Sequence, residues 1–139
     1  GKAEILGCTF YGPSKHCAIM FQAASGVVRN NSILGFEMGI NLENSLPTEV
    51  DSNLIQNCQW GVQVMGHNLS PTQINDNKIW NAHFGIDVEV TGNECGLEIT
   101  NNLIKHVVGP AICVFADAPV VIKKNQMASG MSFGVRVPQ

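Results

Sequence analysis

One asparagine pattern recurs five times along this chain of 139 residues. In each copy, an apolar residue is followed by two further residues, an Asn, one residue and a second apolar residue. The recurring asparagines are Asn31, Asn53, Asn77, Asn102 and Asn125, at steps of 22, 24, 25 and 23 residues. A fixed period in this range is typical of a solenoid, in which each repeat forms one turn of a stack.

A second element follows each Asn at a nearly constant distance. It consists of Gly or another small residue, an apolar residue, any residue and a second apolar residue, at 39–42, 61–64, 85–88, 111–114 and 134–137. A degenerate first copy has Cys8 in place of the Asn and 18–21 as its second element. The chain therefore consists of about six repeats of 22–25 residues.

Both elements alternate apolar residues with other residues, which predicts short β-strands and not helices. Gly, Asn, Asp, Pro and Ser mark the boundaries between the elements, where turns are needed. Two or three short strands in each repeat suit one coil of a parallel β-helix. We therefore expect a single all-β domain, 1–139, with one β-helix of about six coils.

The recurring Asn has a structural role in such a stack. Equivalent residues of neighbouring coils lie about 4.8 Å apart, so each Asn amide can bond to the Asn above it and the Asn below it. Asn also tolerates the left-handed conformation that tight turns require. We expect the five asparagines to form one ladder at a turn. The inward residues that follow them should form a core column of Ile33, Ile55, Ile79, Ile104 and Met127.

The tandem Asn-x-Ile and Gly-Ile-x-Val patterns resemble the parallel β-helix repeat of the pectin-lyase-like superfamily, from about Ile5 to Val137. The resemblance implies a right-handed parallel β-helix. Because the superfamily includes pectate lyases, polygalacturonases, alginate epimerases, phage tailspikes and animal ectodomains, it also implies an extracellular or cell-surface location. The sequence lacks the acidic triplets of polygalacturonases and the Asp-Pro-His-Asp motif of alginate epimerases, and it has no match to the Arg-centred site of pectate lyases.

The composition limits the possible partners. Only 14% of the residues are charged, and the net charge of −3 does not support nucleic-acid binding. No apolar run approaches the roughly 20 residues of a membrane span. The five cysteines show no Cys-x-x-Cys spacing, so we expect neither a disulfide framework nor a metal site, and we expect no cofactor.

The repeats extend almost to both ends of the sequence, which leaves little room for caps. An open coil exposes a cross-section of the core and unpaired strand edges. We therefore expect this chain to be a piece of a longer protein with flanking domains, or to self-associate through its ends.

Four outward-facing residues are candidates for catalysis: Glu37, His83, Asp87 and Glu89. Glu37 and His83 flank Gln59 in successive coils, about 10 Å apart, so a sugar bound across Gln59 could touch both. Asp87 and Glu89 lie on one strand face about 7 Å apart, which suits inverting glycoside hydrolysis. The alternative is that these positions are polar only because alternate residues of a strand face solvent.

A second set of residues suggests binding. The outward positions Asn41, Gln63 and Asp87 form a polar column. Trp60 and Phe84 share the position before the recurring Gly in adjacent coils, and Trp80 follows Ile79. An exposed aromatic pair could stack on sugar rings, although an aromatic ladder packed under a loop is the commoner arrangement.

Three functions remain open at this stage. The first is a non-catalytic β-helix module of a larger surface, secreted or phage-type protein, engaging carbohydrate or a protein partner along its outer face. The second is a polysaccharide lyase, hydrolase or epimerase, as the family resemblance implies. The third is a structural spacer or assembly module. The missing catalytic motifs favour the first, so we lean away from an enzyme.

Overall fold

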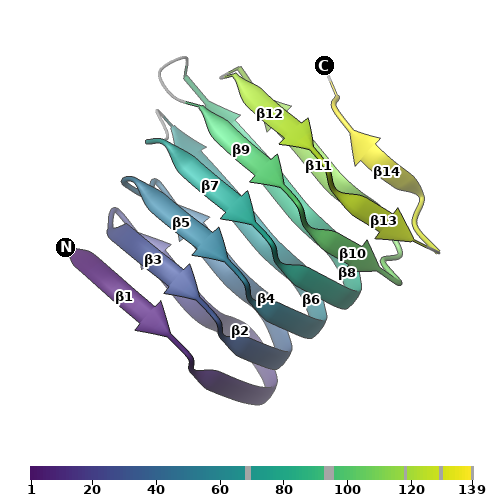
Figure 1. Ribbon diagram of the computed structural model, residues 1–139, viewed down its shortest axis with the longest axis horizontal. Coiled ribbons are helices and arrows are strands. Elements are labelled where there is room, and N and C mark those ends of the chain that lie inside the picture. Colours follow the sequence, from purple (N-terminus) through teal and green to yellow (C-terminus); the bar gives the residue numbers. More distant parts are fainter. Residues whose placement is uncertain (68–69, 93–95, 118, 129, 139) are drawn as a thin grey trace.

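The computed structural model describes residues 1–67, 70–92, 96–117, 119–128 and 130–138. The chain forms a stack of coils along one axis, with the two termini at opposite ends of the stack (Figure 1). Over the described ranges it contains strands and turns and no helix, so none that could cross a membrane. The predicted all-β solenoid of about six coils is confirmed.

The strands form two parallel sheets. The first has the order β1 (Lys2–Leu6), β3 (Ser25–Arg29), β5 (Thr48–Asp51), β7 (Thr72–Asn75), β9 (Leu97–Thr100) and β12 (Val120–Lys123). The second has the order β13 (Gln126–Ala128), β10 (Leu103–Lys105), β8 (Lys78–Thr91), β6 (Leu54–His67), β4 (Ser32–Glu43) and β2 (Thr9–Gln22). β10 pairs with the first residues of β8, whereas β11 (Pro110–Ala116) pairs with its second half, from Ile86 to Val90. β14 (Phe133–Arg136) then pairs with β11.

The pairing register advances by one repeat per coil, so equivalent residues stack. The predicted inward column is confirmed by the pairs along β4, β6, β8, β10 and β13, which join Ile33, Ile55, Ile79, Ile104 and Met127 in that order. Its four isoleucines are buried, whereas Met127 in the last coil is half-buried. Strand periodicity was therefore sufficient to identify the core.

The long strands bend at residues with positive φ. The bends lie at Gly35 in β4, Asn57 in β6 and Asn81 in β8. In β6 the inward residues Ile55 and Cys58 are three positions apart instead of two, because the corner residue Asn57 is inserted between them. These corners let one strand follow the core around a turn of the coil.

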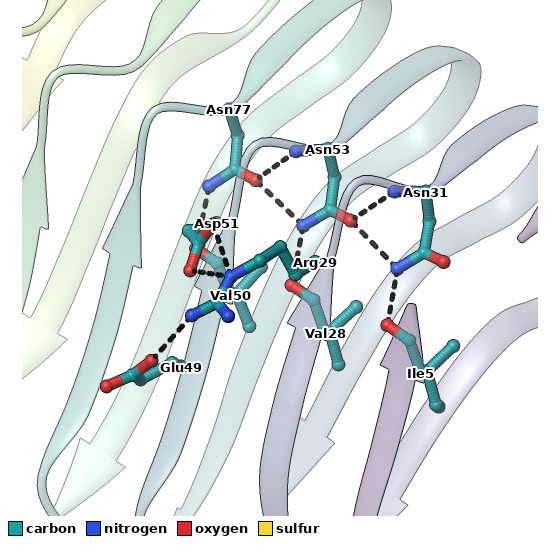
Figure 2. Close-up of polar contacts among 9 residues, drawn as sticks. All are labelled: Ile5, Val28, Arg29, Asn31, Glu49, Val50, Asp51, Asn53 and Asn77. Carbon is teal, nitrogen blue, oxygen red and sulfur yellow. Dashed lines mark hydrogen bonds and ion pairs between the residues drawn. The ribbon is translucent and has the colours of Figure 1, made fainter. Parts of the chain in front are cut away.

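The asparagine ladder (Asn31, Asn53, Asn77, Asn102 and Asn125) also forms as expected. Figure 2 shows its first three members, Asn31, Asn53 and Asn77. The Asn53 Nδ2 donates to Asn77 Oδ1 at 2.9 Å and to the Val28 carbonyl at 3.0 Å. The Asn31 backbone N–H donates to Asn53 Oδ1 at 3.0 Å. Each amide from Asn31 to Asn102 thus bonds to the ladder Asn of the next coil and to a strand carbonyl of the preceding coil. The Cys8 N–H donates to Asn31 Oδ1 at 2.8 Å at the N-terminal end of the series.

One detail of the turn differs from the sequence-based expectation. The left-handed conformation belongs to the residue before each ladder Asn, with φ between 57° and 59° at Asn30, Ser52, Asp76, Asn101 and Lys124. The reason is that the ladder Asn must point its side chain inward along the stack. The preceding residue makes the sharp change of direction, and its side chain is exposed.

The recurring Gly of the second element is needed because neighbouring coils approach closely there. A Cβ added to Gly61 would lie 2.6 Å from the Gly85 carbonyl oxygen and 2.7 Å from Ile79 Cγ2. Its φ is not in the left-handed region, so space and not backbone conformation selects Gly here.

The core is less covered at the two ends of the stack. Ile5 and Phe10 in the first coil are half-buried, and Val135 in the last coil is 41% exposed although it pairs with the buried Ile112. These open ends are compatible with flanking domains.

Candidate functional site

A groove of about 680 Å³ lies where the first coil departs from the regular pattern. We call it the bulge groove, and its lining residues are Pro13, Ser14, Lys15, Gly35, Phe36, Glu37, Asn57, Gln59 and Trp60. They come from β2, β4 and β6, so three successive coils build the groove. Two residues singled out from sequence, Glu37 and Trp60, lie together in it.

The groove exists because the first coil contains extra residues. From Cys8 to Ala18 the chain advances ten positions, whereas the equivalent step from Asn31 to Gly39 is eight. The pairing of β2 with β4 accordingly shifts register between Tyr11 and Ser14 and again between Ser14 and Cys17. Such a bulge bends the strand and re-aims its side chains, and here it brings Lys15 to the groove.

The lining combines groups that suit an amphipathic ligand. Lys15 and Glu37 are exposed charges of opposite sign, and Asn57 and Gln59 are exposed amides with donors and acceptors. Phe36 and Trp60 are half-buried aromatic side chains. A ligand with both hydroxyl groups and apolar CH faces could satisfy both kinds of surface.

The aromatic pair is arranged along the stack axis. Trp60 and Phe84 are stacked with ring centroids 5.7 Å apart and an interplanar angle of 12°, and Met38 is the register partner of Trp60 on its other side. One indole face is therefore occupied by Phe84, which corresponds to the aromatic ladder considered above. Trp80 pairs with Gln56 on the other side of the Asn81 corner and does not line the groove.

The polar column predicted on the second element lies in register as expected. Its members from β2 to β14 are Met20, Asn41, Gln63, Asp87, Cys113 and Arg136. Asn41, however, is only 4% exposed, because neighbouring side chains cover it. A ligand on the outer surface would meet Gln63 and Asp87 before Asn41.

Asp87 has the most distinctive environment among the four catalytic candidates. Burial is the main reason that its carboxyl pKa is raised above the ordinary value of 3.8, and the Glu89 carboxylate raises the pKa further. Hydrogen bonds from the side chains of Trp60 and Gln63 oppose the shift. A half-buried carboxyl with a raised pKa is a recognised feature of general acids, although structural carboxyls show it as well.

The four catalytic candidates do not share one pocket. Glu37 lines the bulge groove, whereas His83 is exposed on β8 with its ring against Phe84, at a centroid distance of 4.8 Å. Asp87 and Glu89 lie farther along β8, and neither lines the bulge groove. Of the four candidates, only Glu37 therefore lines the bulge groove, whereas Asp87 and Glu89 remain neighbours on β8.

Replacing Asp87 by Asn is expected to raise the melting temperature at pH 7. The pKa of Asp87 is higher in the folded state than in the unfolded chain. As the pH rises through 3.8, Asp87 therefore ionises first in the unfolded chain, and the folded state loses stability until its own Asp87 carboxyl has ionised. Asn keeps an acceptor for Trp60 and removes the charge next to Glu89. Thermal melts of the parent and of Asp87→Asn between pH 3 and pH 7 test this: the gain should shrink toward acid pH. A lower melting temperature for Asp87→Asn at pH 7 would contradict it.

A second, smaller groove of about 420 Å³ lies over the first sheet. Its lining residues are Lys2, Ser25, Gly26, Val27, Pro47, Thr48, Glu49, Pro71 and Gln73. Beside it, Arg29 pairs with both Asp51 oxygens through Nε, at 2.9 and 3.0 Å, and with Glu49 through Nη2 at 3.1 Å (Figure 2). The Glu49 carboxylate, which lines this groove, is therefore already paired with Arg29.

Most of the bulge groove was not predicted from the sequence. Lys15, Phe36 and Asn57 were not identified, because each lies at a corner or in the irregular first coil. The available signal was the longer step between Cys8 and Ala18. Among the residues that the structure describes, no group of three or more His, Cys, Asp or Glu side chains is placed to hold a metal ion. Cys95 lies outside the described residues.

Comparison with known proteins supports the fold assignment. Residues 1–137 match the family described as "right handed beta helix region". The match covers nearly the whole chain and agrees with the predicted hand of the coil. No curated protein and no solved structure matches the chain significantly.

Proposed function

Because this chain belongs to the right-handed β-helix family, we propose that it is a non-catalytic β-helix module of a larger surface, secreted or phage-type protein, and that it binds carbohydrate along its outer face. The observation that carries the proposal is the bulge groove, which joins exposed charges, amides and aromatic surface in one hollow of about 680 Å³. Pockets of this size and mixed lining are where small ligands bind.

The chemistry of the groove favours a neutral oligosaccharide. Lys15 and Glu37 carry opposite charges, so the lining has no strong net preference for an anion or a cation. The amides of Asn57 and Gln59 can each donate to and accept from sugar hydroxyls. Phe36 and the edge of Trp60 offer apolar surface for the CH faces of a sugar ring.

The placement of the carboxyl groups supports a non-catalytic role. Acid–base catalysis needs its groups within hydrogen-bond reach of the same bond. Among the described residues, Glu37 is the one acidic side chain that lines the bulge groove. Asp87 and Glu89 lie outside the groove. Lys15 also lines the groove, and its ammonium group can donate a hydrogen bond to a ligand hydroxyl without transferring a proton.

Asp87 favours one alternative function, a polysaccharide-active enzyme. Its raised carboxyl pKa and its neighbour Glu89 fit the pair of carboxylates that an inverting glycoside hydrolase requires. An assay for newly formed reducing ends on a panel of polysaccharides distinguishes the two functions. Turnover abolished by Asp87→Asn or Glu89→Gln, with a melting temperature no lower than that of the parent, would replace the binding proposal by the enzyme.

Binding should depend on Gln59 and Glu37. We expect Gln59→Ala and Glu37→Ala each to weaken binding of a neutral oligosaccharide, found by screening an immobilised glycan array, by about tenfold, because each loses hydrogen bonds to the ligand. Both side chains are exposed, so the melting temperature should stay unchanged. The matched control is Glu98→Ala, an exposed residue of β9 in the other sheet.

The outcomes of this experiment are distinct. Equal affinity of all three variants and the parent for a glycan that does bind would exclude the bulge groove as the site. An array without any bound glycan would remove carbohydrate as the ligand and leave a protein partner or a spacer role.

A further inference from the structure

One aromatic residue of the bulge groove stands at a core position of the repeat. Phe36 occupies the position that Cys58 and Ala82 occupy in the next two coils, five residues after the ladder Asn. Cys58 and Ala82 are register partners, and each is 4% exposed. Phe36 packs against the same core, yet it is only half-buried and lines the groove. The groove therefore reaches an uncovered part of the core.

The bulge of the first coil is the reason that Phe36 is uncovered. Its register partner in β2 is Ser14, whose short side chain cannot cover an aromatic ring. The Ser14 hydroxyl accepts a hydrogen bond from the His16 backbone N–H at 3.2 Å, which holds the bulge in its own local turn. The exposed part of the Phe36 ring thus forms the floor of a small apolar hollow.

Contacts on both sides of the bulge limit the size of this hollow. On one side the backbones of Gly12 and Gly35 are in contact, with no room for a Cβ on Gly12. On the other side regular pairing resumes at Cys17 and Met38. Because the first two coils are joined at both places, the hollow suits a methyl-sized group and not a second ring.

Two side-chain amides border the same groove. Asn57 and Gln59 lie directly before and after Cys58 in β6, and both are exposed lining residues. A side-chain amide has a carbonyl oxygen that accepts and an NH₂ group that donates. It can therefore pair with the N–H and the C=O of a ligand amide at the same time.

The charges of the groove favour an uncharged substituent. Lys15 and Glu37 are both exposed and carry opposite signs, so a carboxylate or an ammonium group on the ligand would be attracted by one and repelled by the other. An acetamido group is uncharged, has one N–H and one C=O, and ends in a methyl group. It matches the apolar hollow, the amides and the charge balance together.

We propose that the bulge groove selects a sugar with a 2-acetamido group, whose methyl lies against Phe36 and whose amide pairs with Asn57 or Gln59. This inference rests on the proposed carbohydrate-binding function and adds the substituent of the sugar that is recognised. A hydroxyl group at the same carbon supplies neither the methyl nor the carbonyl. Since one carbon in an apolar pocket typically changes affinity by about tenfold or more, the preference should be at least of that size.

Three β-1,4-linked tetrasaccharides that differ only at carbon 2 test the inference: the oligomers of N-acetylglucosamine, glucose and glucosamine. In calorimetric titrations of the full chain, we expect the acetylated oligomer to bind about tenfold or more tightly than either of the others. The double variant Asn57→Gly with Gln59→Leu removes both amides, and glycine suits the φ of 55° at residue 57. It should reduce the preference by about threefold or more, the equivalent of a lost hydrogen bond. The matched control is Gln73→Leu, an exposed residue of β7 in the other sheet, which should keep the full preference.

A magnetic resonance measurement locates the methyl group directly. The protein is labelled with ring-¹³C phenylalanine and saturated with the acetylated tetrasaccharide. The acetyl methyl protons should show a nuclear Overhauser effect to the ring resonance of Phe36, which is assigned by its absence from Phe36→Leu. Melting curves of all variants verify that each is folded.

The outcomes distinguish this inference from the function on which it rests. Equal binding of the acetylated and glucose oligomers, a preference unchanged in the double variant, or a bound acetylated oligomer without an Overhauser effect to Phe36 would each overturn the acetamido assignment. Carbohydrate binding that depends on Gln59 and Glu37 would remain in those cases. Failure of the acetylated oligomer to bind would also overturn the assignment, whereas the proposed function fails only when no glycan of the array binds.

Discussion

Replacing Ile79 by Ala is expected to lower the free energy of unfolding by about 2–5 kcal/mol, the range for a fully buried aliphatic side chain. Ile79 is 0% exposed and stands in the middle of the inward column, between Ile55 and Ile104. The value should fall in the upper part of the range. Backbone hydrogen bonds hold the coils on both sides at a fixed spacing, so the surroundings cannot collapse into the cavity.

Urea denaturation followed by circular dichroism measures this effect. The matched control is Lys78→Ala, which changes the exposed neighbour in the same strand and should alter stability by less than about 0.5 kcal/mol. Hydrogen exchange should show that Ile79→Ala loosens the coils of β6, β8 and β10 first, because a solenoid unit contacts only its neighbours. A loss no larger than that of Lys78→Ala would show that Ile79 is not in the core.

Replacing Asn77 by Ala should destabilise the protein by about 3 kcal/mol, the upper range for leaving buried polar groups unpaired. Its Nδ2 donates to the Val50 carbonyl and to Asn102 Oδ1, each at 3.0 Å. Its Oδ1 accepts from Asn53 N–H at 3.0 Å and from Asn53 Nδ2 at 2.9 Å. Alanine removes all four bonds: the Asn53 N–H loses its side-chain acceptor, whereas Asn102 Oδ1 keeps the backbone N–H of residue 77 and Asn53 Nδ2 keeps the Val28 carbonyl.

Two further variants separate the ladder from a general packing effect. Asn77→Asp keeps the acceptor for Asn53 but loses both donated bonds, and it places a carboxylate against the Val50 carbonyl, so it should be no more stable than Asn77→Ala. Asn125→Ala should cost less than Asn77→Ala, because Asn125 ends the ladder and is only half-buried, so that water can replace its bonds. Equal thermal melts for the parent, Asn77→Ala and Asn77→Asp would contradict a stabilising ladder.

The sequence alone determined the solenoid, its register, its core column and its ladder. The physical reason is that hydrogen bonds between parallel coils stack equivalent residues, so the repeat spacing of Asn53, Asn77 and Asn102 already defines which side chains meet. Two-residue alternation then decides which side faces the core, as the buried Ile55 and Ile79 show.

Only the tertiary structure decided the features that break this regularity. The bulge groove depends on how the extra residues around Lys15 leave the register, and no periodicity describes that path. The cover over Asn41 and the contact between Cys17 and Met38 also depend on side-chain packing across coils. The repeat specifies the stack because equivalent residues recur in every coil. The bulge groove forms where the first coil differs from the next one, and the path of its extra residues depends on packing between coils, which the repeat pattern does not describe.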